Sequence, residues 1–175
     1  MSDNNIQMVD LKGQYKKIKN QIDAAIFSVI ESTAFIKGPE VKEFQNELEK
    51  YLGVRHVIPC GNGTDALQIA LMALDLKHGD EVITADFTFA ATVEVIGLLN
   101  LVTVFVDLDS ATFNINVDEL KKAITPKTKA IIPVHLFGQC ANMEAIMEIA
   151  AKNKLYVIED AAQAIGAEYT FANGQ

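Results

Sequence analysis

Two adjacent carboxylates, Glu159 and Asp160, directly follow a short apolar stretch at residues 156–158. The apolar stretch predicts a buried strand, and an unpaired carboxylate buried at its end would cost several kcal/mol. Ligands of open parallel sheets bind at the carboxyl ends of the strands. We therefore expect either that both carboxylates face water there or that one of them meets a cation.

A turn with two glycines, Gly61-Asn62-Gly63, comes directly before Thr64 at the predicted start of a helix. A helix N-terminus presents backbone N–H groups and the positive end of the helix dipole, and it therefore suits a phosphate group. Thr64 or Asp65 can cap the helix, and the Thr64 hydroxyl can also reach a phosphate oxygen. The same residues also fit an ordinary capped turn without a ligand. On this pattern alone, both interpretations stay open.

The turn also fits the dinucleotide-binding fingerprint, with Gly61, Gly63 and Ala66 at its small-residue positions and Asp86 about 20 residues further on. Pro59, in the strand predicted just before the turn, argues against this match. A nicotinamide-binding domain is therefore kept as an alternative.

Two aromatic residues, Phe87 and Phe89, lie in a loop after the strand predicted at residues 81–85. We expect Phe87 to cover the core. Phe89 can offer a flat face to a planar ligand, which is worth on the order of 1 kcal/mol beyond its burial.

Three other polar residues follow predicted strands. His135 comes after the strand at residues 130–134, and a lone histidine there is more often structural than catalytic. Asp107 and Asp109 end another strand, where we expect them to cap a turn rather than to bind a metal, because no further ligands occur at metal spacing.

The secondary structure expected from the sequence alternates strands and helices after an N-terminal helical segment. Residues 6–14 are expected to be extended. Strands are predicted at residues 56–59, 81–85, 102–106, 130–134 and 155–158, and helices at 15–31, 39–52, 64–76, 89–100, 117–124 and 143–152. This alternation predicts a mostly parallel sheet in a three-layer α/β/α domain. We expect residues 1–55 to form an extended segment with helices, and residues 56–175 to belong to the ligand-binding domain.

Composition excludes several classes of protein. The formal net charge is −8 and no Lys/Arg-rich run occurs, which argues against nucleic acid and anionic membranes as partners. No apolar run approaches the roughly 20 residues of a membrane span, and the polar N-terminus is unlike a signal peptide. Cys60 and Cys140 are then expected to be reduced thiols in a cytoplasmic protein. No metal site is expected.

The three strand-end features suit one ligand. A phosphate site, a stacking aromatic and a carboxylate together describe a planar, phosphorylated ring with a protonated nitrogen, and pyridoxal phosphate has all three properties. In this interpretation the glycine turn binds the phosphate, Phe89 stacks on the ring and Asp160 pairs with the pyridinium nitrogen. Gln163 is then placed to hold the phenolic oxygen of the ring.

The sequence resembles the nucleotide-sugar aminotransferases of the DegT/DnrJ/EryC1/StrS type, which are pyridoxal phosphate enzymes of fold type I. The motifs that carry this resemblance occur in order along nearly the whole chain: Val9-Asp10-Leu11, Gly38-Pro39-Glu40-Val41, Gly61-Asn62-Gly63-Thr64-Asp65-Ala66-Leu67, Gly79-Asp80-Glu81-Val82-Ile83, Thr88-Phe89-Ala90-Ala91-Thr92, Phe105-Val106-Asp107, Val134-His135-Leu136-Phe137-Gly138 and Glu159-Asp160-Ala161-Ala162-Gln163. The resemblance implies part of the large, cofactor-binding domain of fold type I, without the small C-terminal domain.

The resemblance also implies roles for five residues. Gly63 and Thr64 correspond to the backbone and hydroxyl groups that hold the phosphate, and Phe89 corresponds to the aromatic residue that stacks on the ring. Asp160 corresponds to the partner of the pyridinium nitrogen, and Gln163 to the residue on the phenolic oxygen. The implied cofactor is pyridoxal 5′-phosphate.

The activity implied by the resemblance is transfer of an amino group from glutamate to a nucleotide-linked keto sugar. The form of the glycine motif is most similar to members that aminate carbon 3, including a group that makes 3-amino uronic-acid sugars for surface polysaccharides. Members of the family are homodimers with active sites shared across the interface.

The lysine that bonds the cofactor in this family lies in a later Ser-x-x-x-x-Lys segment, which has no match here. None of the lysines near the C-terminal end matches that position: Lys127, Lys129, Lys152 and Lys154. We therefore expect the chain to be the N-terminal portion of an aminotransferase and to be inactive alone. The alternatives are a dehydratase of the same fold with histidine in place of that lysine, and a binding domain without chemistry.

Overall fold

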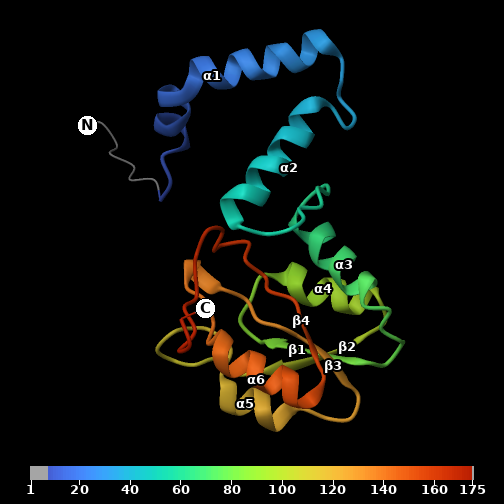
Figure 1. Cartoon of the computed structure of the whole chain (residues 1–175). Helices are drawn as coiled ribbons and strands as arrows, with labels where there is room; N and C mark the ends of the chain where they lie inside the picture. Colours follow the sequence, from blue (N-terminus) through green and yellow to red (C-terminus); the bar gives the residue numbers. More distant parts are fainter. Residues whose placement is uncertain (1–7, 175) are drawn as a thin grey trace, which may run out of the picture. The chain divides into compact units, whose positions relative to one another are not determined.

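The structure is a computed structural model that describes residues 8–174. The chain divides into two units between Pro59 and Cys60 (Figure 1). The first unit contains the helices α1 (Leu11–Ser32) and α2 (Pro39–Leu52), and the second contains the sheet and the remaining helices.

Helix α1 begins earlier than predicted. Asp10 caps it, because its carboxylate accepts a hydrogen bond of 2.8 Å from the backbone N–H of Gly13. This cap starts the helix at Leu11, so the prediction of an extended segment up to residue 14 is wrong for residues 11–14, while residues 6 and 7 lie outside the described residues. Helix α2 has the predicted bounds, with Pro39 in its first turn and Gly53 in the left-handed conformation at its end.

Residues 56–59 do not form the predicted strand. The backbone of Val57 bonds to side chains of α2 instead of to a neighbouring strand. Its N–H donates to Glu49 over 3.2 Å, and its carbonyl oxygen accepts from the Gln45 amide over 2.6 Å. These two side chains satisfy backbone groups that a ladder would otherwise pair.

The second unit contains a parallel four-stranded sheet in the order β2-β1-β3-β4. Its strands are β1 (Glu81–Ala85), β2 (Val102–Val106), β3 (Thr128–Ile132) and β4 (Tyr156–Val157). Strands β1 and β2 have the predicted bounds. Strand β3 ends before Pro133, which has no N–H to donate, but pairing with the chain after β4 resumes as a bridge between Val134 and Asp160. This bridge fixes the place of Asp160 relative to β3.

Helices cover both faces of this sheet, as the alternating pattern predicted (Figure 1). Helices α3 (Gly63–Ala73) and α4 (Ala90–Leu98) pack on the face that carries Val82 and Ile132. Helices α5 (Val117–Ala123) and α6 (Met143–Asn153) pack on the face that carries Ile83 and Ile131. Strands β1 and β3 are therefore covered on both faces, which explains why both are continuous apolar runs.

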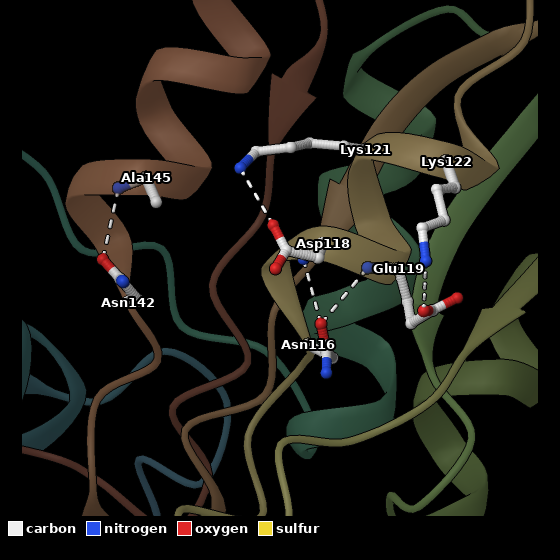
Figure 2. Close-up of polar contacts among 7 residues, drawn as sticks. All are labelled: Asn116, Asp118, Glu119, Lys121, Lys122, Asn142 and Ala145. Atoms are coloured by element: carbon white, nitrogen blue, oxygen red, sulfur yellow. Dashed lines mark hydrogen bonds and ion pairs between the residues drawn. The ribbon is translucent and has the colours of Figure 1, made fainter.

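Local caps set where the helices of the second unit begin. Figure 2 shows that the side chain of Asn116 accepts hydrogen bonds from the first turn of α5, and that Asn142 does the same for Ala145 in α6. Ion pairs three residues apart, Lys121 with Asp118 and Lys122 with Glu119, lie along α5. Such exposed pairs add little stability, so packing against the sheet holds these helices in place.

Within residues 8–174, none of the helices is both long and apolar enough to span a membrane.

Candidate functional site

A cavity of about 240 Å³ lies in the second unit, at the carboxyl edge of the sheet. Its lining includes all five predicted site residues: Gly63, Thr64, Phe89, Asp160 and Gln163. They come from the start of α3, the residue before α4, and the chain that follows β4. The fold therefore gathers residues that are up to 100 positions apart, counting from Gly63 to Gln163, around one space.

Asp160 is the buried acid of this cavity. Only 8 % of its surface is exposed. One carboxylate oxygen accepts a hydrogen bond of 2.8 Å from the Thr92 hydroxyl, and the other accepts one of 3.2 Å from the Ala162 N–H. Backbone bonds to Pro133 and His135 hold the residue against the end of β3.

No cation among the described residues pairs with Asp160. None of the ion pairs formed within residues 8–174 includes it, and its described donors are a hydroxyl and an amide, both neutral. A buried carboxylate without a charged partner is costly. A positively charged group in the adjoining cavity would offset that cost, which is the relation expected from the sequence.

The sequence analysis did not predict that Thr88 and Thr92 form hydrogen bonds next to Asp160. Thr92 in α4 is fully buried, and its hydroxyl lies 3.0 Å from that of Thr88. Their spacing of four residues was a usable signal, because a side chain just before a helix and one in its first turn lie close together. Nothing local, however, connects Thr92 to Asp160, which is 68 residues away.

The N-terminus of α3 supplies donors to the same cavity. Gly63 and Thr64 are its first residues, and their backbone N–H groups have no acceptor inside the helix. The helix is capped by Asn62, whose side chain accepts from the Asp65 N–H over 2.9 Å, so the prediction of a cap at Thr64 or Asp65 is wrong. The Thr64 hydroxyl is therefore not needed as the cap. A Cβ on Gly61 would approach the Asp65 carboxylate to 2.7 Å, so this glycine makes room for the turn.

Gln163 is oriented by the loop after β3. Its side-chain oxygen accepts a hydrogen bond of 2.7 Å from the Phe137 N–H. Phe137 holds the left-handed conformation, with φ of 57°, in the short 3₁₀ helix Leu136–Gly138. Because the oxygen of the amide is occupied, its NH₂ group is the part that can donate to another molecule.

The two phenylalanines of the aromatic loop differ in position. Phe89 lines the cavity and is 75 % exposed, so a large part of its ring can contact a ligand. Phe87 is 51 % exposed and packs against Phe113, with ring centroids 6.4 Å apart. The prediction that Phe87 covers the core is therefore wrong: its contact is with another half-exposed loop residue.

His135 is buried and bonded at both ring nitrogens, as expected of a structural residue. Its Nδ1 accepts from the Ala141 N–H over 3.2 Å, so the proton is on Nε2, which donates to Glu159 over 2.8 Å. This bond lowers the pKa of the Glu159 carboxyl from its ordinary value, against an opposing effect of partial burial. Glu159 therefore bonds to His135 at the end of the sheet, while Asp160 lines the cavity.

The turn after β2 confirms the capping role expected for Asp109. One of its carboxylate oxygens accepts from the Thr112 N–H, the Thr112 hydroxyl and the Ala111 N–H at 2.9–3.1 Å. Asp107 accepts from the neighbouring Leu108 N–H over 2.7 Å. Within the described range 8–174, no three His, Cys, Asp or Glu side chains come together as a metal site would require.

Comparison with known proteins identifies the family of the chain. The model of the DegT/DnrJ/EryC1/StrS aminotransferase family matches residues 16–172. Over 94 % of the chain, the sequence is 51 % identical to a UDP-2-acetamido-2-deoxy-3-oxo-D-glucuronate aminotransferase of Pseudomonas aeruginosa. Over 97 % of the chain, it is 44 % identical to a UDP-N-acetyl-3-dehydro-α-D-glucosamine 3-aminotransferase of Acidithiobacillus ferrooxidans. The matches cover 46 % and 45 % of those relatives, so the chain spans about half of their length.

Solved structures confirm the fold. A DegT/DnrJ/EryC1/StrS aminotransferase from Brucella abortus is 46 % identical, with a TM-score of 0.90 over 92 % of this chain and 45 % of that one. A GDP-4-keto-6-deoxymannose-3-dehydratase, solved with a trapped PLP–glutamate geminal diamine, is 32 % identical, with a TM-score of 0.79 over 83 % of this chain and 39 % of that one. The predicted part of a fold type I large domain is thereby confirmed.

Proposed function

Because the chain belongs to the DegT/DnrJ/EryC1/StrS aminotransferase family, we propose that its protein is a pyridoxal-phosphate-dependent aminotransferase acting on a nucleotide-linked keto sugar. The observation that carries this proposal is that Gly63, Thr64, Phe89, Asp160 and Gln163 line one cavity. Each of these residues has a donor, acceptor or flat face that suits one part of that cofactor.

The phosphate is assigned to the start of α3. The backbone N–H groups of Gly63 and Thr64 lack acceptors inside the helix, and the helix dipole adds a positive potential there. The Thr64 hydroxyl adds a third donor. Together these groups would hold a phosphate by hydrogen bonds and by the helix dipole.

The ring is assigned to the space between Phe89 and Asp160. Phe89 would stack on one face and shield the ring from water. Asp160 would accept a hydrogen bond from the ring N–H, and its negative charge would keep the proton on that nitrogen. The NH₂ group of Gln163 would donate to the phenolic oxygen, because Phe137 already occupies the amide oxygen.

When bound, pyridoxal phosphate accepts the amino group and withdraws electrons from the carbon that loses a proton. Asp160 would support that withdrawal by keeping the positive charge on the ring nitrogen. The groups on α3 and Gln163 would each hold a different part of the cofactor and so restrict its orientation. We predict that the lysine that would move the proton lies in a further segment of the protein.

The substrate is assigned from the relatives. Two of them act, by their names, on 3-oxo or 3-dehydro nucleotide sugars. We infer the same carbon for this protein, with glutamate as amino donor, a cytoplasmic homodimer as the active form, and amino-sugar synthesis for a surface polysaccharide as its role. As a single chain of 175 residues, it is expected to be inactive.

The test uses the full-length protein that contains this chain. Purified protein should take up pyridoxal phosphate, show visible absorbance of the bound cofactor, and release 2-oxoglutarate when glutamate and a nucleotide-linked 3-keto sugar are supplied. Asp160→Ala should abolish the absorbance. A correctly folded full-length protein that takes up no cofactor would refute the proposal.

A dehydratase is the second candidate, because a sugar dehydratase shares this fold at 32 % identity. Parallel incubations of the full-length protein with glutamate and either a nucleotide-linked 3-keto sugar or a nucleotide-linked 4-keto sugar that keeps its 3-hydroxyl separate the two activities. An amino sugar as product identifies the transaminase, whereas loss of water from the sugar identifies the dehydratase. The higher identity to the 3-aminotransferases favours transamination.

A further inference from the structure

Behind the cavity, two hydroxyls and a carboxylate form a chain that runs from Thr88 through Thr92 to Asp160. The Thr92 oxygen lies 2.8 Å from an oxygen of Asp160 and 3.0 Å from the Thr88 oxygen. Thr92 has no exposed surface, and Thr88 is half-buried. Neither threonine lines the cavity.

The direction of this chain follows from the number of protons. An ionised carboxylate can only accept, so the Thr92 hydroxyl must donate its one proton to Asp160. Thr92 then has none left for Thr88, and the Thr88 hydroxyl must donate to Thr92. Thr88 thus donates to Thr92, and Thr92 donates to Asp160. Hydrogen bonds aligned in one direction in this way strengthen one another.

We propose that Thr92 is a positioning residue for Asp160, oriented in turn by Thr88, and that it sets the carboxylate to receive the ring N–H of the cofactor. This inference rests on the proposed function. Its physical basis is that a carboxylate can rotate about its bond to Cβ. Thr92 holds one oxygen and the Ala162 N–H holds the other, so the plane of the group is fixed from two sides.

Fixing the plane matters because, within residues 8–174, Asp160 has no charged partner to orient it. Without Thr92, only the longer bond of 3.2 Å from Ala162 would restrain the carboxylate side chain. Binding of a ring N–H would then require the Asp160 carboxylate to become ordered, and this ordering would lower the affinity. Thr92 therefore acts on the ring nitrogen only through Asp160, and on no other part of the cofactor.

The experiment measures the dissociation constants of two ligands for the full-length protein. One is pyridoxamine phosphate, which binds without a covalent bond to the protein. The other is its analogue with a carbon in place of the ring nitrogen. Thr92→Val keeps the shape and removes the hydroxyl. We expect it to raise the dissociation constant of pyridoxamine phosphate about tenfold, the effect of losing one hydrogen bond to a charged group, and to leave that of the analogue unchanged.

Two variants act as controls for Thr92→Val. Thr92→Ser keeps the hydroxyl and should retain most of the affinity for pyridoxamine phosphate. Thr84→Val removes another fully buried hydroxyl, which donates to the Ile132 carbonyl oxygen over 2.9 Å and does not line the cavity. It should lower stability without changing either dissociation constant. If Thr92→Val fails to fold, Thr88→Val carries the test, with an expected loss of about threefold for pyridoxamine phosphate alone.

The outcomes separate this inference from the function on which it rests. If the wild-type protein binds neither ligand, or binds both equally, the proposed role of Asp160 fails. If the wild-type protein prefers the nitrogen-containing ligand but Thr92→Val weakens both ligands equally, or neither, the positioning role of Thr92 is overturned. A loss confined to pyridoxamine phosphate supports it.

Discussion

The turn after β2 and the corner after β4 each pair an aspartate with a threonine, yet the two pairs serve different ends. Asp109 accepts hydrogen bonds from residues two and three positions ahead, Ala111 and Thr112. Asp160 accepts from Thr92, which is 68 positions away, and it borders a cavity. The first carboxylate is satisfied by its own turn, whereas the second depends on the assembled fold.

The two carboxylates therefore differ in what completes their surroundings. The donors of Asp109 are supplied by the turn that it caps, so no ligand is needed to complete its surroundings. The donors of Asp160 hold the carboxylate but leave its charge unbalanced. A carboxylate in these surroundings suits a cationic ligand, which is the role that we propose for Asp160.

The largest expected effect comes from removing the negative charge of Asp160. Asp160→Asn keeps the shape and lets the Thr92 hydroxyl still donate, but it removes the negative charge. The dissociation constant of pyridoxamine phosphate for the full-length protein should rise on the order of a hundredfold, because a buried charge pair is broken. Fluorescence titration of the ligand measures it.

Asp109→Asn is the matched control, with the same chemical change in the turn after β2. It should leave the dissociation constant unchanged, because all the described contacts of Asp109 are within its own turn. Equal losses of affinity in the two variants would contradict the separation of roles between the two aspartates.

A smaller effect is expected from pH on the Asp109 turn. Hydrogen bonds from the Thr112 N–H, the Thr112 hydroxyl and the Ala111 N–H lower the pKa of Asp109 below its ordinary value of 3.8. Because the pKa is lower in the folded state, the stability that it contributes is present above the unfolded pKa and is lost as the pH falls toward the folded value.

Thermal unfolding of the full-length protein from neutral pH to pH 3 measures this contribution. In the wild-type protein, the melting temperature should fall as the pH drops below about 4. Asp109→Ala should have a lower melting temperature at neutral pH and a shallower fall toward acid. Parallel curves for wild type and variant would show that the turn does not depend on an ionised Asp109.

The sequence was most informative where contacts are local. The bounds of β1, β2 and α2 were predicted because each has a simple pattern, apolar runs for the strands and Pro39 with Gly53 at the ends of the helix. The role of Asp109 was predicted for the same reason. Residues 56–59 failed because their pattern favoured a strand, whereas Gln45 and Glu49 occupy the backbone of Val57.

The residues that line the cavity were predicted from the sequence, but the hydrogen bonds that hold Asp160 were not. Topology alone brings the strand ends together, so the five lining residues could be placed on one edge of the sheet. The contact of Thr92 with Asp160 was not predicted, because it depends on how α4 packs on the sheet. Phe87 was misplaced for a similar reason, since its neighbour Phe113 comes from the loop after β2.

The smallest expected effect tests the residue beside Asp160. Glu159 receives a hydrogen bond from a distant residue, as Asp160 does, but 54 % of its side chain is exposed and its partner is a histidine. The hydrogen bond from His135 lowers the pKa of Glu159 below 4.5, so its stability contribution is present above the unfolded pKa and lost as the pH falls through the folded pKa. Solvent screening limits that contribution to under about 1 kcal/mol.

Glu159→Gln keeps an acceptor for the Nε2–H of His135 and removes the charge. The melting temperature at neutral pH should fall by no more than a few degrees, and the difference from wild type should vanish in acid. Affinity for pyridoxamine phosphate should stay the same, because Glu159 does not line the cavity. A loss of affinity as large as that of Asp160→Asn would contradict this separation. It would mean that both carboxylates, and not Asp160 alone, attract the positively charged ring of the ligand.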